Sequence, residues 1–356
     1  MDAAGATRPL HFDFAKPGPF AAGFVNFEVT DPTRGRLLAM TLWYPAVPAA
    51  SEPASVATAF YTGEKRAALD QLLADSPAGC ATRFVPESGS GVPVAAPKSW
   101  PLVAFSHCHT CTRVSSFSLA ERLATFGIAV IAPDHTGNTL FDKLEGKAAG
   151  LSQATLAERT ADIRFALDVA LDATGTALPA HLRGRFDITR VGAFGHSFGA
   201  VTTGRVLQTD PRVRVGLAIA APMENPLLPG VIVSEIQKPI LWLLASEDDS
   251  ITAAGLEMMR ENYANAKAPA WLVEVADAGH FTFSDIAGLK GFGSGCGNGK
   301  RLGSGEPFAF MANSDGRTVA MRVVAAFFAA HLLADDRAAA GMAVGLPVGV
   351  TVHAKP

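Results

Sequence analysis

The chain has little cysteine, no excess of either charge and no long apolar run. Its 356 residues include 30 Lys and Arg against 33 Asp and Glu, a formal net charge of −3. This near balance gives no electrostatic footprint for nucleic acid, and we expect no nucleic-acid partner. No apolar run reaches the roughly 18 residues that a membrane-spanning helix needs, so we expect no membrane span. Hydrophobic residues make up 49% of the chain, which is ample for a sizeable core.

The first residues, MDAAGATRPLHF, contain no basic stretch followed by an apolar core. A secretory signal peptide is therefore not predicted. The pattern fits a cytoplasmic protein, or an exported protein whose signal has been removed, and localisation stays open between the two.

The four cysteines are Cys80, Cys108, Cys111 and Cys296. They are too few for a disulfide scaffold at this length. The spacing of Cys108 and Cys111 resembles a redox or zinc half-site, but no second cysteine or histidine pair follows at a matching spacing, so we expect no metal. A bridge between Cys80 and Cys296 is an alternative for an exported protein.

Beyond the first hundred residues, apolar runs alternate with amphipathic stretches, a pattern typical of parallel βαβ units. The segment 155–171 places Leu156, Ile163 and Leu167 on one helical face, and 317–333 predicts a long apolar closing helix. Six apolar runs are predicted as buried strands: 102–105, 127–132, 191–194, 213–219, 239–245 and 270–275.

The first third of the chain has a different pattern. Segments 25–29 and 38–43 alternate as antiparallel strands would at a sheet edge. Residues 46–100 are rich in Ala, Pro and Ser, with a short helix predicted around 66–73. We interpret them as an insertion between early strands, and we interpret 335–356 as a C-terminal tail of small residues that is ordered only in part.

The segment Gly195-His-Ser197-Phe-Gly199 matches the G-x-S-x-G nucleophile elbow. An apolar strand precedes it and a helix-compatible stretch follows, which is the context the motif requires. A sharp turn from strand to helix holds the serine in a strained conformation, and small neighbours let the backbones approach. Ser197 is thus the predicted nucleophile, and the backbone N–H of Phe198 is a predicted oxyanion donor at a helix N-terminus.

The acid of a catalytic triad should follow a later strand, because the order in this fold is serine, acid, histidine. The strand predicted over 239–245 is followed by Ser246-Glu-Asp248-Asp249-Ser-Ile251. Asp249 stands just before the Ser-Ile at which the chain resumes, so Asp249 is the predicted acid and Asp248 is the alternative. The acid would set the imidazole tautomer and stabilise its charged form.

The base is predicted to be His280, in the loop after the strand at 270–275. Gly279 precedes it, which suits a loop tip that returns toward the serine. His331 lies in the closing helix and His196 lies inside the elbow, so we interpret both as structural. His11, His181 and His353 have no supporting context.

The second oxyanion donor is expected from the loop over 105–110, after the third strand of the sheet. A backbone N–H needs only the right geometry, so side-chain identity says little about it. We favour His109 for this role and interpret His107 as a structural residue that holds the loop by hydrogen bonds.

The glycine-dense segment 291–300 invites a phosphate-binding interpretation, but it fails the Walker pattern. Ser294 replaces the first glycine, Arg301 replaces the Ser or Thr, and no strand directly precedes the segment. We expect a surface loop near His280, with a substrate-gating lid as the alternative.

Taken together, several segments resemble the bacterial relatives of platelet-activating factor acetylhydrolase, which group near dienelactone hydrolase-like and polyester hydrolase-like esterases. The matching segments are Asp31-Pro-Thr-Arg34, Leu42-Trp-Tyr-Pro45, Val103-Ala-Phe-Ser-His107, Ala132-Pro-Asp-His135 with Gly137-Asn138, the elbow, and Ala278-Gly-His-Phe-Thr-Phe283. The resemblance implies an α/β-hydrolase fold, a triad of Ser197, Asp249 and His280, and oxyanion donors at Phe198 and His109.

The chain departs from these families at three places. Cys108 stands where the family has glycine in the oxyanion loop. The animal acetylhydrolases carry their acid after the strand that follows the elbow helix, where this chain has Ala220; this favours the later acid and leaves Glu224 as a distant alternative. Dienelactone hydrolases use a cysteine nucleophile, and Ser197 argues against that chemistry.

The sequence therefore predicts an α/β-hydrolase fold over residues 1–334, with a mostly parallel central sheet flanked by helices, the insertion at 46–100 and the tail at 335–356. The predicted function is a serine carboxylic-ester hydrolase that works without cofactor, through an acyl-enzyme, on short-chain or aromatic esters or on polyesters. Its partner is then a small or polymeric ester, and oligomeric state stays open. An amidase or thioesterase with the same triad is an alternative, as is a non-catalytic ligand-binding protein.

Overall fold

The computed structural model describes residues 13–49, 54–77, 80, 86–96, 99–293, 295–335, 337–343 and 345–356. His11 lies outside these residues.

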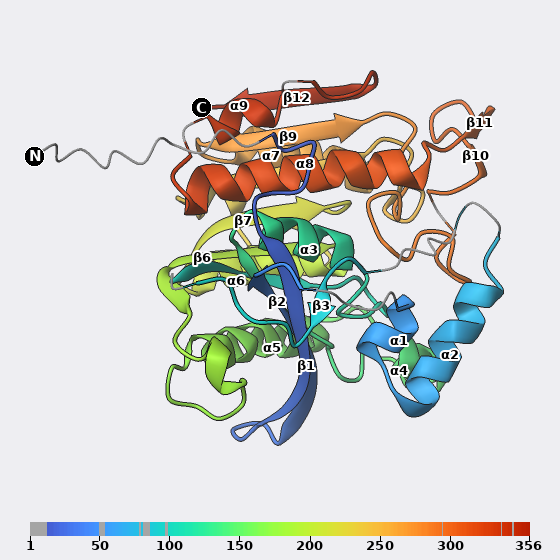
Figure 1. Cartoon of the computed structure of the whole chain (residues 1–356). Coiled ribbons are helices and arrows are strands. Elements are labelled where there is room, and N and C mark those ends of the chain that lie inside the picture. Colours follow the sequence, from blue (N-terminus) through green and yellow to red (C-terminus); the bar gives the residue numbers. More distant parts are fainter. Residues whose placement is uncertain are drawn as a thin grey trace, which may run out of the picture.

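Six parallel strands form the centre of the main sheet (Figure 1). In spatial order they are β9 (Ala270–Val275), β8 (Ile240–Ala245), β7 (Val213–Ile219), β6 (Phe186–His196), β4 (Trp100–Ser106) and β5 (Ala129–Pro133). Each coincides with a run predicted as a buried strand, and the mostly parallel sheet with flanking helices confirms the predicted α/β-hydrolase fold.

Further strands complete the sheet at both edges, and all of them form antiparallel pairs except β3, which pairs in parallel with β1. Beside β5 lie β2 (Arg36–Ala46), β1 (Ala21–Asp31) and the two-residue β3 (Gly89–Ser90), and beside β9 lies β12 (Val350–Lys355). A separate two-stranded sheet is formed by β10 (Asn298–Lys300) and β11 (Pro307–Ala309).

Successive side chains of a strand face opposite sides of the sheet, and helices cover both faces. On β4, Val103 and Phe105 pack into one core cluster, whereas Leu102 and Ala104 pack into another. The first cluster includes residues of α3 (Phe117–Thr125) and α8 (Asn313–Leu332), which lie in front of the sheet in Figure 1. The second includes residues of α5 (Gln153–Leu171), α6 (Phe198–Thr209) and α7 (Thr252–Asn265). The carboxyl ends of the parallel strands are thereby left to the loops.

The predicted insertion contains two helices, α1 (Val56–Phe60) and α2 (Gly63–Ala74), which lie to one side of the sheet (Figure 1). A disulfide between Cys80 and Cys296 joins the insertion to the segment that follows β9. The shorter elements are α4 (Leu140–Leu144), α9 (Ala338–Gly341) and two 3-10 helices, Ala180–Leu182 and Val233–Glu235.

The C-terminal segment differs from the prediction of a partly ordered tail. Its last strand, β12, pairs along its whole length with β9, from Val350 opposite Val275 to Lys355 opposite Ala270. An unpaired edge strand exposes a row of backbone donors and acceptors, and β12 satisfies them. The segment therefore belongs to the sheet and covers one of its edges.

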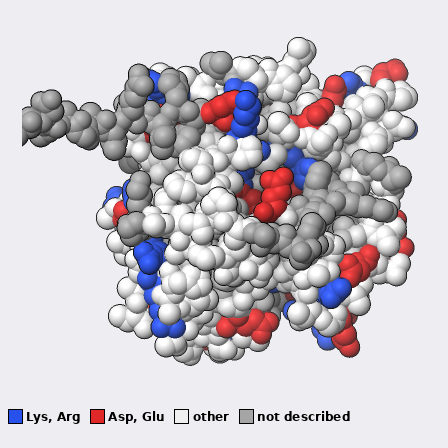
Figure 2. Space-filling view, in the orientation of Figure 1, with Lys and Arg blue, Asp and Glu red and all other residues white. Residues whose placement is uncertain are grey.

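The face shown in Figure 2 is largely uncharged, and acidic and basic groups are scattered over it in small groups of both signs. This distribution agrees with the near-zero net charge. Among the described residues, no helix is both long and apolar enough to cross a membrane.

Candidate active site

Ser197 occupies the turn between β6 and α6, where β6 ends at His196 and the helix begins at Phe198. Its backbone has φ 56° and ψ −121°, a region that a residue with a side chain rarely adopts. A Cβ at Gly195 would overlap the carbonyl of Gly199, and a Cβ at Gly199 would overlap the carbonyl of Ser106. Both glycines of the motif are therefore required by close packing of the elbow.

A buried carboxylate lies against the imidazole of His280. Nδ1 of His280 is 2.7 Å from Oδ2 of Asp248, and Asp248 is fully buried. Because a carboxylate accepts, Nδ1 carries the proton, which leaves Nε2 as the basic nitrogen. The other carboxylate oxygen accepts from the backbone N–H of Ser250 at 3.0 Å and of Ile251 at 3.2 Å. Asp248 is thus held from both sides.

The structure places the alternative, Asp248, against His280 in place of the predicted Asp249. Asp249 is exposed, whereas Asp248, one residue earlier, faces the interior beneath His280. The cause is the turn after β8, in which Asp248 bonds to the backbone ahead of it and so points its second oxygen inward. The Asp-Asp pair in the sequence contains no signal for this choice, because either residue could close such a turn.

His196 ties the elbow to the loop that carries His280. Its Nε2 donates to the carbonyl oxygen of His280 at 2.8 Å, and the two rings lie 4.9 Å apart between centroids. Burial, assisted by the nearby His280, lowers the pKa of His196 to about 3, so the ring stays neutral. The histidine next to the serine therefore has a structural contact, and that contact brings the loop of His280 over the end of β6.

The glycine-dense segment packs against the same loop. A Cβ at Gly279 would lie 2.6 Å from Cα of Gly295, so the two backbones are in direct contact. Oγ1 of Thr282 accepts from the Gly279 N–H at 2.8 Å and donates to the Gly295 carbonyl at 3.1 Å. The segment thus lies beside the loop of His280, as expected from the sequence, and its contacts with Gly279 and Thr282 support that loop.

The loop after β4 approaches the N-terminus of α6. Within the described part of the chain, the backbone N–H groups of Phe198 and His109 donate to no other residue. The His109 ring accepts from the Asn138 side chain at 2.9 Å and lies edge-on to the Phe198 ring, 6.3 Å away. A disulfide between Cys108 and Cys111 closes this short loop. The two free N–H groups are available to an anionic oxygen.

His107 holds the loop in the way a structural histidine would. Its Nδ1 donates to the Cys108 carbonyl at 2.7 Å, and its Nε2 accepts from the backbone N–H of His135 at 3.0 Å. Burial keeps the pKa of His107 well below its usual value, with a further contribution from the neighbouring His135. The ring is therefore neutral and both of its nitrogens are used.

A second series of serine, histidine and aspartate lies under this loop. Ser106 Oγ is 3.0 Å from Nε2 of His135, and Nδ1 of His135 is 3.0 Å from Oδ2 of Asp162. All three residues are at most 1% exposed, so no substrate can reach the serine. Asp162 also binds Arg34 and Arg36, which makes this series part of a buried polar network.

Arg159 was not among the predicted site residues, although it is fully buried and hydrogen-bonds to Ser106, His107 and Thr202. One signal was available. Arg159 falls three residues after Leu156 and four before Ile163, on the apolar face predicted for this helix. A charged residue on a core-facing stripe is rare unless it is paired.

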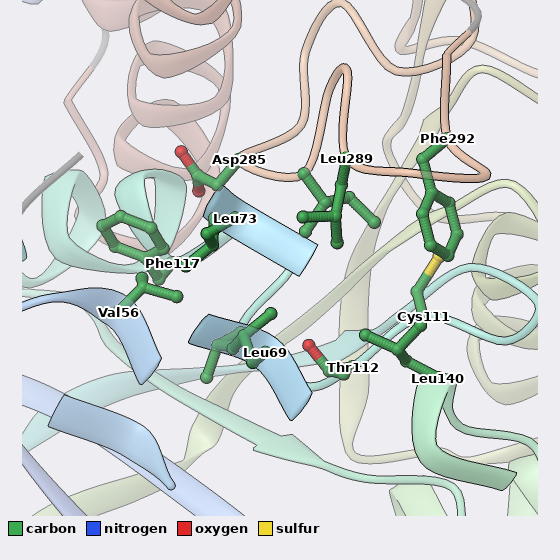
Figure 3. Close-up of a pocket in the computed structure, with 12 residues that line it drawn as sticks. Val56, Leu69, Leu73, Cys111, Thr112, Phe117, Leu140, Asp285, Leu289 and Phe292 are labelled. Carbon is green, nitrogen blue, oxygen red and sulfur yellow. The ribbon is translucent and has the colours of Figure 1, made fainter. Parts of the chain in front are cut away.

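A narrow apolar cavity lies between α2, the loop after Cys111 and the loop over 285–292 (Figure 3). Leu289 and Phe292 extend from the latter loop toward it (Figure 3). Phe292 packs on Phe281, 5.2 Å between centroids, and Phe281 packs on His280 at 4.8 Å. The cavity thus continues an aromatic layer that begins at His280. Its lining residues are Val56, Leu69, Leu73, Cys111, Thr112, Val114, Phe117, Leu140, Asp285, Ile286, Leu289 and Phe292.

The parallel sheet, the strained serine turn and the buried acid–histidine pair at the strand ends define an α/β-hydrolase. The chain belongs to the dienelactone hydrolase family, whose model matches residues 93–287. Among solved structures it is similar to the ferulic acid esterase from Streptomyces cinnamoneus, with a TM-score of 0.65 and 23% sequence identity. That match covers 90% of this chain and 93% of the other. A comparison with curated proteins returned no match.

Proposed function

We propose that this protein is a serine carboxylic-ester hydrolase, with Ser197 as nucleophile, His280 as general base and Asp248 as the acid. The observation that carries the proposal is the 2.7 Å hydrogen bond between His280 and Asp248, from loops that follow β9 and β8. His196 links this pair to the elbow of Ser197. Family membership supports ester hydrolysis as the reaction class.

The reaction would proceed through an acyl-enzyme. Oγ of Ser197 attacks the ester carbonyl carbon while its proton passes to Nε2 of His280, and the negative oxygen of the tetrahedral intermediate accepts from the N–H groups of Phe198 and His109. Collapse of the intermediate releases the alcohol, which takes the proton from His280. Water then attacks the acyl group and gives a proton to His280, and collapse of the second intermediate releases the acid while His280 returns that proton to Oγ of Ser197.

The proposed substrates are short-chain or aromatic esters, including polyester segments. The aromatic rings of Phe281 and Phe292 that pack in sequence from His280 suit a substrate with uncharged groups. The name of the similar ferulic acid esterase makes a hydroxycinnamate ester a sensible probe of the aromatic class.

The test is hydrolysis of a p-nitrophenyl ester series from acetate to long chains, and of methyl ferulate, by the wild type and Ser197→Ala. Activity in the wild type alone supports the proposal, and the profile of kcat/KM against chain length measures the acyl site. A folded wild type without activity on any ester overturns it. An amide and a thioester probe would then show whether the same residues cleave those bonds.

A further inference from the structure

Arg159 is a fully buried arginine on α5 whose side chain binds three separate parts of the site. One terminal nitrogen donates to Oδ1 of Asn138 at 2.7 Å. The other donates to Oγ of Ser106, at 3.1 Å, and to the carbonyl of His107. Nε donates to Oγ1 of Thr202 on the elbow helix, at 3.3 Å. The planar guanidinium therefore spans the oxyanion loop and α6.

The same side chain is connected to both residues that carry the proposed oxyanion donors. It contacts Phe198 directly and reaches His109 through Asn138. The guanidinium lies over the Phe198 ring, 4.6 Å from its centroid. On the other side Asn138, held by Arg159, donates to the His109 ring at 2.9 Å. A rigid fork with fixed donor directions can thus set the separation between the two segments that carry the free N–H groups.

The need to balance a buried negative charge does not explain why an arginine is buried at position 159. Asp162, the carboxylate whose charge acts on Arg159, already binds Arg34 and Arg36 and the ring of His135. Burying one more cation there costs free energy that an apolar residue of similar size would avoid. Burial lowers the pKa of Arg159 to about 9, although Asp162 acts to raise it, so the group stays charged at neutral pH.

We propose that Arg159 is the positioning residue of the oxyanion hole, which it assembles by clamping the loop of His109 to the elbow of Phe198. This inference rests on the proposed esterase function and concerns the same site. Since Arg159 touches neither the nucleophile nor the imidazole, it should act on the stability of the oxyanion and leave substrate binding in the ground state unchanged.

The test compares Arg159→Lys and Arg159→Gln with the matched control Arg34→Gln. Arg34 belongs to the buried polar network around Asp162, and its hydrogen bonds go to Asp31, Glu158 and Asp162 instead of the loop of His109 or α6. Loss of an oxyanion donor costs about 10²–10³ in kcat, so misplacement of both donors should lower kcat by about 10- to 100-fold with KM within about twofold. Affinity for a trifluoromethyl ketone, which forms an oxyanion on the serine, should fall in parallel, and Arg34→Gln should keep wild-type values.

A second variant keeps the inference testable if the Arg159 variants do not fold, as judged by circular dichroism. Asn138→Leu removes the link from Arg159 to His109 but leaves the buried cation in place. It should also lower kcat and the trifluoromethyl ketone affinity together, with KM unchanged. A folded Arg159→Lys or Asn138→Leu enzyme with wild-type kcat and inhibitor affinity overturns the role of Arg159 while the esterase function stands. A wild type that hydrolyses no ester overturns both.

Discussion

The two serine–histidine–aspartate series contain the same three residue types and differ in everything around them. Ser106, His135 and Asp162 form an unbroken chain of hydrogen bonds, each 3.0 Å long, in the interior. Ser197 lies partly exposed at a strained turn, one residue after His196, whose ring hydrogen-bonds to the carbonyl of His280. The hydrogen-bonding order alone therefore does not define a catalytic triad.

Three physical differences separate the two series. Ser106 already accepts a hydrogen bond from Arg159, so its oxygen is engaged by a cation. Complete burial, with a further contribution from the neighbouring arginines, holds the pKa of His135 well below its usual value. Ser106 is the last residue of β4 and is followed by a loop, whereas Ser197 immediately precedes α6 and the N–H of Phe198. The Ser106 series therefore lacks three features of the Ser197 series: exposure to solvent, a strained backbone at the serine, and the proposed oxyanion donor beside it.

The largest expected effect separates the two serines. Ser197→Ala should lower kcat by about 10⁴- to 10⁶-fold, the range seen when a serine nucleophile is removed. Ser106→Ala should lower kcat by less than about tenfold, because Ser106 supports the loop and is not attacked by substrate. Labelling with a fluorophosphonate and peptide mapping checks the assignment, since label found on Ser106 would break the comparison.

The next effect concerns the acids. Asp248→Asn should lower kcat by about 10⁴-fold, because an amide at this position favours the wrong imidazole tautomer. Asp249→Asn is the matched control, since it makes the same change one residue along on an exposed side chain, and kcat should change by less than about tenfold. Steady-state kinetics on one p-nitrophenyl ester decides between them. A larger loss in Asp249→Asn would restore the original assignment.

The two disulfides close loops of very different length around the Ser197 site, and we expect them to contribute differently to the unfolding free energy. Cys80 and Cys296 are 216 residues apart, so removing their bond with serines should cost about 2–5 kcal/mol of unfolding free energy. The Cys108–Cys111 bond closes only a short loop and should contribute less by the same entropic argument. Urea unfolding of the two double-serine variants measures both. Equal losses would contradict the loop-length argument.

The smallest effect is the share of His135, one of several buried neutral histidines, in the slope of stability with pH. The unfolded chain takes up a proton at His135 near pH 6.5, whereas the folded protein keeps this ring neutral because of burial and the nearby arginines. The unfolding free energy should therefore fall as pH drops below 6.5, by up to about 1.4 kcal/mol per pH unit for this group. His135→Gln should have a shallower slope in urea unfolding between pH 6.5 and 5. Parallel curves for both proteins would show that His135 is not responsible.

Local patterns predicted the centre of the fold well. The six buried strands, α5 and α8 were all indicated by apolar runs or helical periodicity, and the elbow by its two glycines. These signals are local because strand and helix periods, and the close packing at Gly195 and Gly199, involve neighbours in the chain. His280 was also predicted from local signals, because it follows a strand and is preceded by Gly279.

Other features depended on contacts distant in sequence. Asp248 and Asp249 are adjacent, and only the turn against Ser250 and Ile251 selects which carboxylate faces His280. The C-terminal segment was predicted as a tail because its residues are small, although Val350 and Val352 alternate as in a strand, and it pairs with the edge of β9. Arg159 was visible as a charge on an apolar face, but its partners come from three other segments.

By itself the sequence determined the succession of strands and helices, the position of the serine turn and the residue types from which a triad could be drawn. Tertiary structure decided which aspartate meets His280, which of two serine–histidine–aspartate series is open to solvent, and how Arg159 joins the oxyanion loop to the elbow. The physical reason is the distance along the chain over which each kind of interaction acts. Periodicity and backbone strain act between neighbours along the chain, whereas burial, hydrogen-bond direction and access arise only when distant segments pack together.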